Sequence, residues 1–179
     1  MSRYYTGKGD DGNTGILSSK RLSKDDPIIE AIGTVDELNS YIGVAIFYIH
    51  DDLVSKKLRM IQNDLFVIGA ELSDIEGRSG AASLKKGSVS MLEESVEAFA
   101  SKIPELKKFV IPGGCEGSVH LQYARAIARK AERYVIKASK KTAISNTVKS
   151  YLNRLSSLLF VMAIYLNNTQ GITEENPVY

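Results

Sequence analysis

Few residues of this sequence could hold a metal ion or form a cross-link. Cys115 is the only cysteine, which excludes an internal disulfide framework, and with only His50 and His120 a zinc site is not expected. No Glu-x-x-His pair occurs, so the di-iron centre that some helical bundles carry is excluded. No Ser-His-Asp or Cys-His arrangement can be assembled either. The sequence therefore offers no evident protein nucleophile and no metal cage of its own.

Long apolar runs and a strong charge excess are also missing. The most apolar stretch, residues 158–166, is too short to cross a bilayer, and the N-terminus has no apolar signal region. We therefore expect a cytoplasmic protein without a membrane partner. A formal net charge of +2 is too small for a general nucleic-acid binder. The length of 179 residues and the hydrophobic content of 44% are typical of one globular domain, residues 1–179.

Helix signals recur five times, whereas strand signals are weak. The pattern predicts an all-α fold, with a helical bundle over residues 25–168. The first helix begins at Asp26-Pro27, a capping residue followed by proline in the first turn, and Ser88 is the predicted cap of the third helix. The other helices are expected at about 54–72, 118–139 and 146–168, with a loop at 74–87. The polar tail, residues 169–179, is expected to fray from Thr173 onward.

Residues 5–14, YTGKGDDGNT, place three glycines ahead of the first helix. Glycine lets the backbone approach an anion, Lys8 adds a positive charge, and Asp10 and Asp11 can orient a metal ion or tie the loop back on itself. The G-x-G-x-x-G match is not a dinucleotide fingerprint, because too few residues precede it to form a buried strand. We interpret residues 1–24 as an N-terminal segment that binds a polyphosphate nucleotide. A flexible glycine-rich arm is the alternative.

A stripe of arginines follows the fourth predicted helix. An alanine-rich seam lets a neighbouring helix approach closely, while Arg125, Arg129 and Glu132 lie along another face. Arginine favours bidentate contacts with phosphate or carboxylate, and Asp36 and Glu37 on the first helix are suitable partners. A solvated charged face is the structural alternative. Asn153 and Arg154 on the fifth helix raise the same choice between a functional role and structural hydrogen bonds.

Six segments of the sequence occur together in the order of one known family. The N-terminal segment is followed by GTVDELNSYIG, IQNDLFVIGAEL, FVIPGG, ARAIARKAER and YLNRLSSLLF, at residues 33–43, 61–72, 109–114, 124–133 and 151–160. Together they resemble the PduO-type ATP:cob(I)alamin adenosyltransferases, also called corrinoid adenosyltransferases. The resemblance covers nearly the whole chain.

This resemblance implies an enzyme that transfers the 5′-deoxyadenosyl group of ATP to the cobalt of cob(I)alamin or a related corrinoid. The products would be adenosylcobalamin and triphosphate. The implied fold is a five-helix bundle of the ferritin-like, up-and-down type. A homotrimer with ATP bound between neighbouring subunits is also implied, with Mg²⁺ bound through ATP and not in a protein-only cage. The implied partners are a cob(II)alamin reductase and, as a candidate recipient of the product, an adenosylcobalamin-dependent enzyme.

The resemblance also implies roles for individual residues. Arg125 would pair with Asp36 across the subunit interface, and Phe109 would shield the corrin ring and keep water from the lower face of cobalt. These three residues and Asn153 form the implied catalytic set. Lys130 stands where many members carry a second consecutive arginine, and we expect little consequence. The residues implied in ATP binding are Thr6, Gly7, Lys8, Gly9, Asp10, Gly12, Thr14, Lys24, Arg129, Glu132 and Asn153.

Two other functions stay open. One is a non-catalytic ATP- or corrinoid-binding helical module with the same fold, and the presence of Arg125, Asp36 and Asn153 argues against it. The other is a helical nucleic-acid binder that uses the basic stripe. The small net charge and the lack of interleaved aromatic residues argue against that function.

Overall fold

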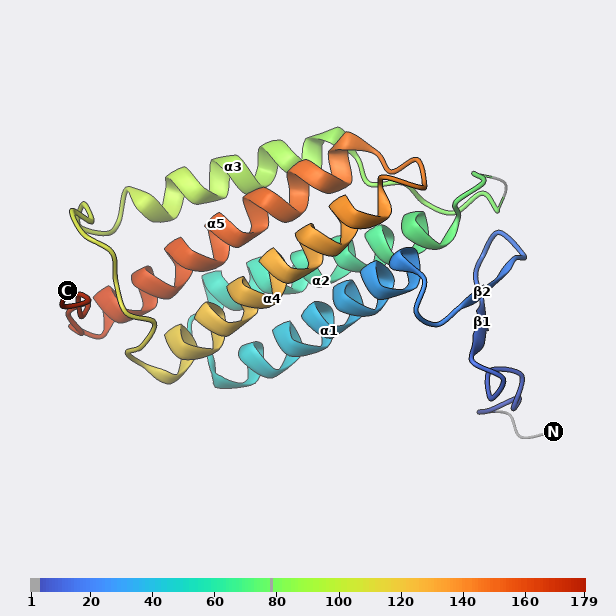
Figure 1. The fold of residues 1–179 in the computed structure, drawn as a ribbon. Helices are drawn as coiled ribbons and strands as arrows, with labels where there is room; N and C mark the ends of the chain where they lie inside the picture. Colours follow the sequence, from blue (N-terminus) through green and yellow to red (C-terminus); the bar gives the residue numbers. More distant parts are fainter. Residues whose placement is uncertain (1–3, 78) are drawn as a thin grey trace.

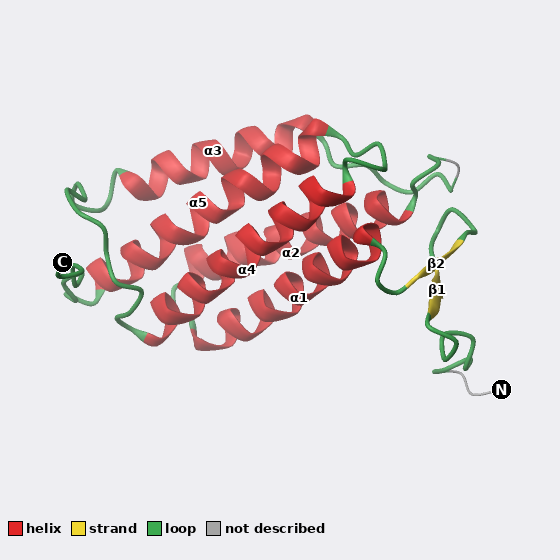
Figure 2. Cartoon of the chain, in the orientation of Figure 1, coloured by secondary structure: helices red, strands yellow, loops and turns green. Residues whose placement is uncertain are grey.

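The structure is a computed structural model, and it describes residues 4–77 and 79–179. Within these residues the chain forms five helices, preceded by a short two-stranded β-hairpin (Figures 1 and 2). The elements are β1 (Asn13–Gly15), β2 (Arg21–Ser23), α1 (Pro27–Tyr48), α2 (Asp52–Ser73), α3 (Lys86–Ala100), α4 (Glu116–Ala138) and α5 (Asn146–Thr169). The predicted five-helix bundle is confirmed.

Successive helices run in opposite directions along the bundle, as in an up-and-down arrangement (Figure 1). Helix α1 packs on α2 and α4, and α5 packs on α4 and α3. The hairpin therefore lies at the end of the bundle where α1, α3 and α5 begin (Figure 1). The long connection between α3 and α4, residues 101–115, lies with the C-terminus at the opposite end.

Side-chain caps fix the start of three helices. The predicted cap Asp26 accepts a hydrogen bond from the backbone N–H of Ile28, and Asp51 and Ser145 cap α2 and α5 in the same way. Helix α3 differs, because it begins at Lys86 without a side-chain cap, two residues before the predicted cap Ser88. That prediction is wrong because the preceding Leu84 is buried and its N–H donates to Glu71, which fixes the entry of the chain into α3.

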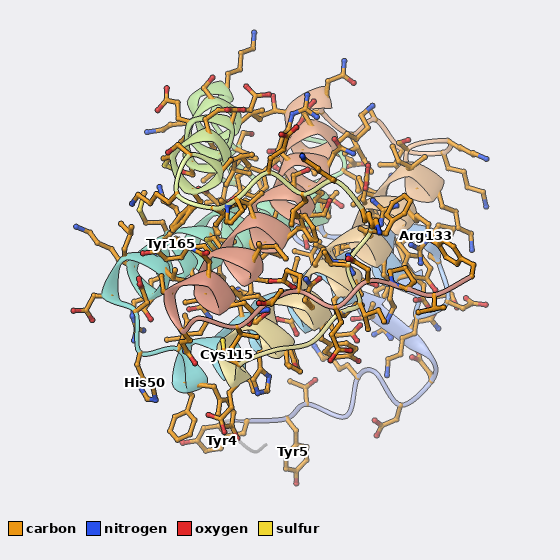
Figure 3. The ribbon with its side chains drawn as sticks, turned by 90° about the vertical axis from the view of Figure 1, so that its left-hand side faces the viewer. Tyr4, Tyr5, His50, Cys115, Arg133 and Tyr165 are labelled. Carbon is orange, nitrogen blue, oxygen red and sulfur yellow. The ribbon has the colours of Figure 1, made fainter. Side chains whose placement is uncertain are left out.

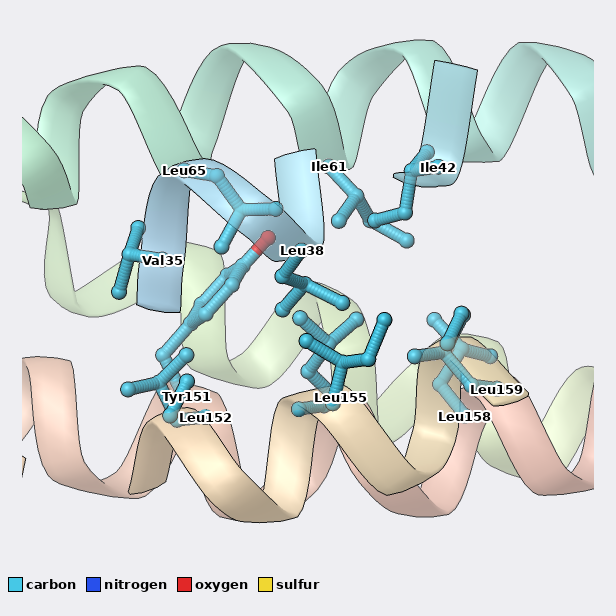
Figure 4. Packing of buried hydrophobic residues seen from close by; sticks show 14 of the residues in the cluster. Val35, Leu38, Ile42, Ile61, Leu65, Tyr151, Leu152, Leu155, Leu158 and Leu159 are labelled. Carbon is cyan, nitrogen blue, oxygen red and sulfur yellow. The ribbon is translucent and has the colours of Figure 1, made fainter. Parts of the chain in front are cut away.

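The core is a continuous apolar cluster that all five helices contribute to, seen from close by in Figure 4. The alanine seam of α4, formed by Ala124, Ala128 and Ala131, is fully buried against its neighbours. Tyr151 crosses the core and donates its hydroxyl to Asp64 Oδ2 on α2 at 2.9 Å. Burial, followed by the charge of Asp64, raises the pKa of Tyr151 well above its usual range.

The β-hairpin is the element that the sequence pattern did not predict. Its strands pair in antiparallel register, with Thr14 opposite Leu22, and the Lys24 N–H donates to Gly12 O at 2.9 Å. Each strand has three residues, which is too short for an alternating pattern to be read. The Ser18 N–H donates to Ser73 O at the end of α2, so the hairpin is also attached to the bundle.

The tail packs on the connection that carries Phe109. The Ile111 N–H donates to Glu175 O, and Asn176 Nδ2 donates to Phe109 O, both at 2.8 Å. The expectation that the tail frays from Thr173 is thus wrong as far as Asn176, because backbone groups of the connection supply partners for it.

Candidate active site

The glycine-rich segment forms a tight loop before β1. Gly7 and Gly12 have φ values of 69° and 81°, which L-residues rarely adopt. Arg21 of β2 closes the loop, because its Nη2 donates to Lys8 O at 2.6 Å and to Asp11 Oδ1 at 2.9 Å. A hydrogen bond from the Asn13 backbone, with the charge of Arg21 also contributing, lowers the pKa of Asp11. Asp11 therefore ties the loop back on itself.

A cleft of about 440 Å³ lies between the hairpin and the α1–α4 face. Thr14 and Lys24 line it from the hairpin side, and Lys130 lines it from α4. Gly9 lies directly beside Lys24, since a Cβ at this glycine would come within 3.4 Å of Lys24 Nζ. Lys130 Nζ donates to Glu37 Oε2 at 2.7 Å across the two helices. The structure thus brings together Gly9, Thr14 and Lys24 of the predicted nucleotide residues.

Arg125 and Asp36 lie on different faces of the bundle. Arg125 Nε donates to Gln122 Oε1 at 2.8 Å on its own helix, and burial, together with the charge of Arg129, lowers the pKa of Arg125. Asp36 lines a separate groove between α1 and α2. In the groove, Asn39 Oδ1 is buried and has no hydrogen-bond partner among the described residues. No ion pair joins Arg125 to Asp36 within the described part of the chain.

A polar chain of four residues crosses from α4 to α3. Asn153 Nδ2 donates to Glu132 Oε1 at 2.9 Å, so these two predicted site residues are in direct contact. Arg154 Nη1 donates to Asn153 Oδ1 at 2.6 Å, and Arg154 Nε donates to Glu93 Oε1 at 2.9 Å. The sequence pattern singled out Asn153, Arg154 and Glu132, but it did not indicate Glu93 as the partner of Arg154.

Phe109 projects from the α3–α4 connection, with 81% of its side chain exposed. Asn167 near the end of α5 holds the Pro-Gly-Gly turn that follows. Its Oδ1 accepts from the Cys115 N–H at 3.0 Å, and its Nδ2 donates to Gly113 O at 3.1 Å and to Glu174 Oε1 at 3.0 Å. Figure 3 looks onto this end of the bundle and labels Cys115, where α4 begins. The ring of Phe109 is therefore carried on a fixed backbone and is itself free to contact a ligand.

Comparisons with known proteins show the family of this chain. A model of the family described as cobalamin adenosyltransferase matches residues 4–166. The chain belongs to this family. It is 41% identical to the corrinoid adenosyltransferase of Bacillus subtilis over 175 residues, which cover 95% of this chain and 89% of that protein. It is 34% identical to the corrinoid adenosyltransferase of Mus musculus over 182 residues, covering 98% of this chain and 77% of that protein.

Solved structures of the same family match this cobalamin adenosyltransferase fold along its length. A phenylalanine-to-alanine variant of the PduO-type ATP:corrinoid adenosyltransferase from Lactobacillus reuteri, complexed with cobalamin and ATP, matches with a TM-score of 0.92 and 32% identity. The match covers 99% of this chain and 100% of that one. An arginine-to-lysine variant of the Lactobacillus reuteri protein, complexed with ATP, matches with a TM-score of 0.90 and 33% identity over 97% of this chain and 99% of that one.

The described residues show neither a metal cluster nor a membrane-spanning helix. Among residues 4–77 and 79–179, no group of three His, Cys, Asp or Glu side chains could hold a metal ion. No helix in the same part of the chain is both long and apolar enough to span a membrane.

Three groups of predicted site residues lie apart from one another, and Arg125 and Asp36 belong to none of them. The N-terminal loop and Lys24 form one group, Asn153 and Glu132 form a second, and Phe109 stands apart at the far end of the bundle. The sequence reading missed Arg21 and Asn167, which hold two of these groups in place. Arginine in a three-residue strand and asparagine near a helix end carry no sequence signal for the contacts that they make here.

Proposed function

We propose that this chain transfers the 5′-deoxyadenosyl group of ATP to the cobalt of cob(I)alamin or a related corrinoid. The products are adenosylcobalamin, or the corresponding adenosylcorrinoid, and triphosphate. One observation carries the proposal: over 99% of its length the chain matches, at a TM-score of 0.92, a protein whose structure holds both cobalamin and ATP.

The reaction needs no nucleophile from the protein. Cob(I)alamin supplies the electron pair of the new cobalt–carbon bond at C5′ of ATP, and the bond from C5′ to the triphosphate oxygen breaks. Triphosphate leaves with the electrons of that bond. The protein has to hold C5′ in line with cobalt and balance the charge of the leaving group, and it can do so with lysines, arginines and backbone N–H groups.

The nucleotide residues fit a triphosphate with its own Mg²⁺. Lys24 brings a positive charge to the cleft, where Lys130 is already paired with Glu37, and the turn at Gly9 and Gly12 lets the backbone approach phosphate. Asp11 is engaged by Arg21, so the donor set suits a Mg²⁺ ion held by the triphosphate oxygens better than a protein cage. When bound there, Mg²⁺ supplies further positive charge against the leaving triphosphate.

We further propose a homotrimer with each site between two subunits. The N-terminal loop and Phe109 lie at opposite ends of one bundle, and α4, with 23 residues, is about 35 Å long. Cobalt and C5′ must approach to roughly 3–3.5 Å, whereas the nucleotide loop and Phe109 of one chain lie at opposite ends of the bundle, so we propose that different chains supply them. A second copy supplies the missing half. The groove with Asp36 and the unpartnered Asn39 Oδ1 offers acceptors for Arg125 of that copy.

Exposed apolar side chains along α1 and α4 support the same assembly. Phe47, Tyr48, Val119 and Tyr123 are all at least 38% exposed, and they gather on neighbouring helices at one end of the α1–α4 face. Apolar groups gathered on one face of a soluble protein are typical of a protein–protein contact. Light scattering with ATP present tests this proposal, and a monomer mass at micromolar concentration would refute it.

Mixing two inactive variants tests whether each site is shared between subunits. We expect Gly9→Val to damage the nucleotide half and Phe109→Ala to damage the corrinoid half. If the halves come from different chains, random trimers from an equal mixture should contain both intact halves in about one site in four. Activity should therefore reappear after the two variants are unfolded and refolded together. A mixture as inactive as its two parents would mean that both halves come from one chain.

Phe109 is proposed to keep polar ligands from the lower face of cobalt. An axial polar ligand stabilises Co(II) against reduction, so an apolar ring in its place makes the required Co(I) state easier to reach. Phe109→His should keep ATP affinity, yet adenosylate slowly from cob(II)alamin and a reductase. Pre-reduced cob(I)alamin should recover much of the rate. An equal loss from both starting states would show that Phe109 only packs against the corrin ring.

Triphosphate release separates the enzyme from a non-catalytic module of the same fold. Incubation with ATP and chemically reduced corrinoid should yield stoichiometric adenosylcorrinoid and triphosphate. ATP binding without either product would favour the module. The enzymatic proposal also includes a reductase as the electron source and a cytoplasmic location.

A further inference from the structure

Arg154 occupies a position that neither the reaction nor the packing of the bundle explains by itself. It lies on α5 next to Asn153 and bridges two acceptors with two different nitrogen atoms, Glu93 Oε1 on α3 at 2.9 Å and Asn153 Oδ1 at 2.6 Å. Its side chain and that of Glu93 are 45% and 49% exposed. Ion pairs this exposed contribute little to folding stability, so a purely stabilising role is a poor explanation.

The contact with Asn153 has a specific consequence for that side chain. A carboxamide has one end that accepts hydrogen bonds and one end that donates them. Because Arg154 can only donate, it holds the oxygen of Asn153 toward itself and turns the amide nitrogen toward Glu132. Asn153 Nδ2 then donates to Glu132 Oε1 at 2.9 Å. The guanidinium thus selects one of the two orientations of the Asn153 side chain.

Glu132 is fixed in turn by this choice. Asn153 holds one carboxylate oxygen of Glu132, so the other oxygen of Glu132 keeps a constant direction. The second N–H of the Asn153 amide is fixed in the same way. In the opposite orientation, Asn153 would turn its oxygen toward a carboxylate, and the two acceptors would repel each other. Glu93 completes the chain by holding the guanidinium from α3, a helix that contributes none of the predicted site residues.

We propose that Arg154 and Glu93 are positioning residues for the nucleotide. Arg154 sets the orientation of Asn153, and through it the carboxylate of Glu132, so that both present preset hydrogen-bonding groups to bound ATP. Glu93 keeps Arg154 in that place. This inference rests on the proposed function, because it assumes that Asn153 and Glu132 contact ATP.

The test compares single variants at Arg154 with a double variant. Arg154→Gln should raise KM for ATP and the calorimetric Kd for ATP by about tenfold or more, with a smaller change in kcat at saturating ATP. Arg154→Lys should not rescue affinity, since one ammonium group cannot reproduce the two-sided bridge. Glu93→Gln keeps an acceptor for Arg154 and should have an intermediate effect. In an Asn153→Ala background, Arg154→Gln should change KM no further, because the group that it orients is absent.

Lys149→Gln is the matched control. It removes one positive charge from the same helix, five residues before Arg154, and should leave KM unchanged. A merely structural role for Arg154 would lower Tm more than the control does and add its effect to that of Asn153→Ala. Either result overturns the inference, as does an unchanged KM in Arg154→Gln. If Arg154→Gln does not fold, Arg154→Lys and Glu93→Gln decide the question by the same readouts.

The wild-type chain separates the two levels of failure. Absence of ATP binding and of adenosyl transfer in the wild type overturns the proposed function, and this inference with it. If the wild type binds ATP normally and the Arg154 and Glu93 variants have unchanged KM and Kd for ATP, this inference alone is overturned.

Discussion

Gly114 is the residue whose replacement most directly tests how the Phe109 connection is held. It has a φ of 102°, and a Cβ added here would overlap the carboxamide of Asn167. Asn167 is 1% exposed and makes the three hydrogen bonds that hold the Pro-Gly-Gly turn and the tail. Gly114→Ala must therefore strain its own backbone and displace Asn167 as well.

The expected loss of stability follows from these two effects. Backbone strain at positive φ costs about 1–3 kcal/mol. Displacing Asn167 weakens three hydrogen bonds at roughly 0.5–1.5 kcal/mol each. Together these amount to about 5 kcal/mol of unfolding free energy. For a chain of this size, each kcal/mol lowers Tm by roughly 2–4 °C, so we expect a decrease on the order of 10–20 °C by calorimetry or circular dichroism.

Gly80→Ala provides a control that introduces backbone strain at positive φ without an overlap between the new Cβ and a neighbouring side chain. Gly80 has a φ of 71°, and a Cβ there would meet nothing within 4 Å, so only a few degrees should be lost. An Asn167→Ala background provides the second control. The overlap with Gly114→Ala is then removed, and this change should cost only its strain. An equal decrease of Tm from Gly114→Ala in the wild-type and Asn167→Ala backgrounds would refute the reasoning. A decrease no larger than that of Gly80→Ala would refute it as well.

Three further predictions concern the nucleotide, the arginine stripe and alkaline stability. Gly9→Val should raise KM for ATP while the protein still folds, because the new side chain would press on Lys24; an unchanged KM would make the loop a passive arm. Arg125→Lys keeps the charge but loses the planar fork, and the loss of one charge-assisted contact should lower turnover by about tenfold or more; near-normal turnover would contradict the pairing with Asp36. The raised pKa of Tyr151 keeps its hydroxyl protonated in the folded protein, whereas in the unfolded chain it ionises above about pH 10. Above that pH the unfolding free energy should therefore fall by about 1.4 kcal/mol per pH unit. Urea titrations from pH 9 to 11 should show that the unfolding free energy falls less steeply with pH in Tyr151→Phe than in the wild type. An identical slope in both proteins would contradict the raised pKa of Tyr151.

The bundle was predictable from the sequence because its helices carry repeated local signals. Asp26 and Pro27 mark a helix start by chemistry that acts within a few residues, and the structure has both in those roles. The spacing of buried residues such as Val35, Leu38 and Ile42 repeats the signal over a long segment. The start of α3 could not be read in this way, since a distant carboxylate, Glu71, holds the preceding loop.

The candidate site was predictable only in part, because many of its contacts join residues far apart in sequence. Arg21 closes the glycine-rich loop through the carbonyl of Lys8 and the carboxylate of Asp11. The hairpin that brings Arg21 there has strands of three residues, so no periodic pattern announces it. From the sequence, Asp11 could either bind a metal ion or tie the loop back on itself. Only the pairing of the strands favours a role for Asp11 in holding the loop.

The tail shows most clearly why composition alone misjudged a functional region. A segment with few apolar residues gains little from burial, and for that reason it was expected to fray. Here the contacts that hold it are hydrogen bonds, one of them between the backbone groups of Ile111 and Glu175, and a backbone group has no residue type to recognise. The ring of Phe109 stands on that backbone, 81% exposed, while Asn167 fixes the turn behind it. The backbone that carries this exposed ring is already held from two sides. Binding a ligand therefore costs little additional conformational entropy. If Phe109 has the role proposed above, the tail contacts that composition could not predict would lower the entropic cost of placing its ring against a corrin.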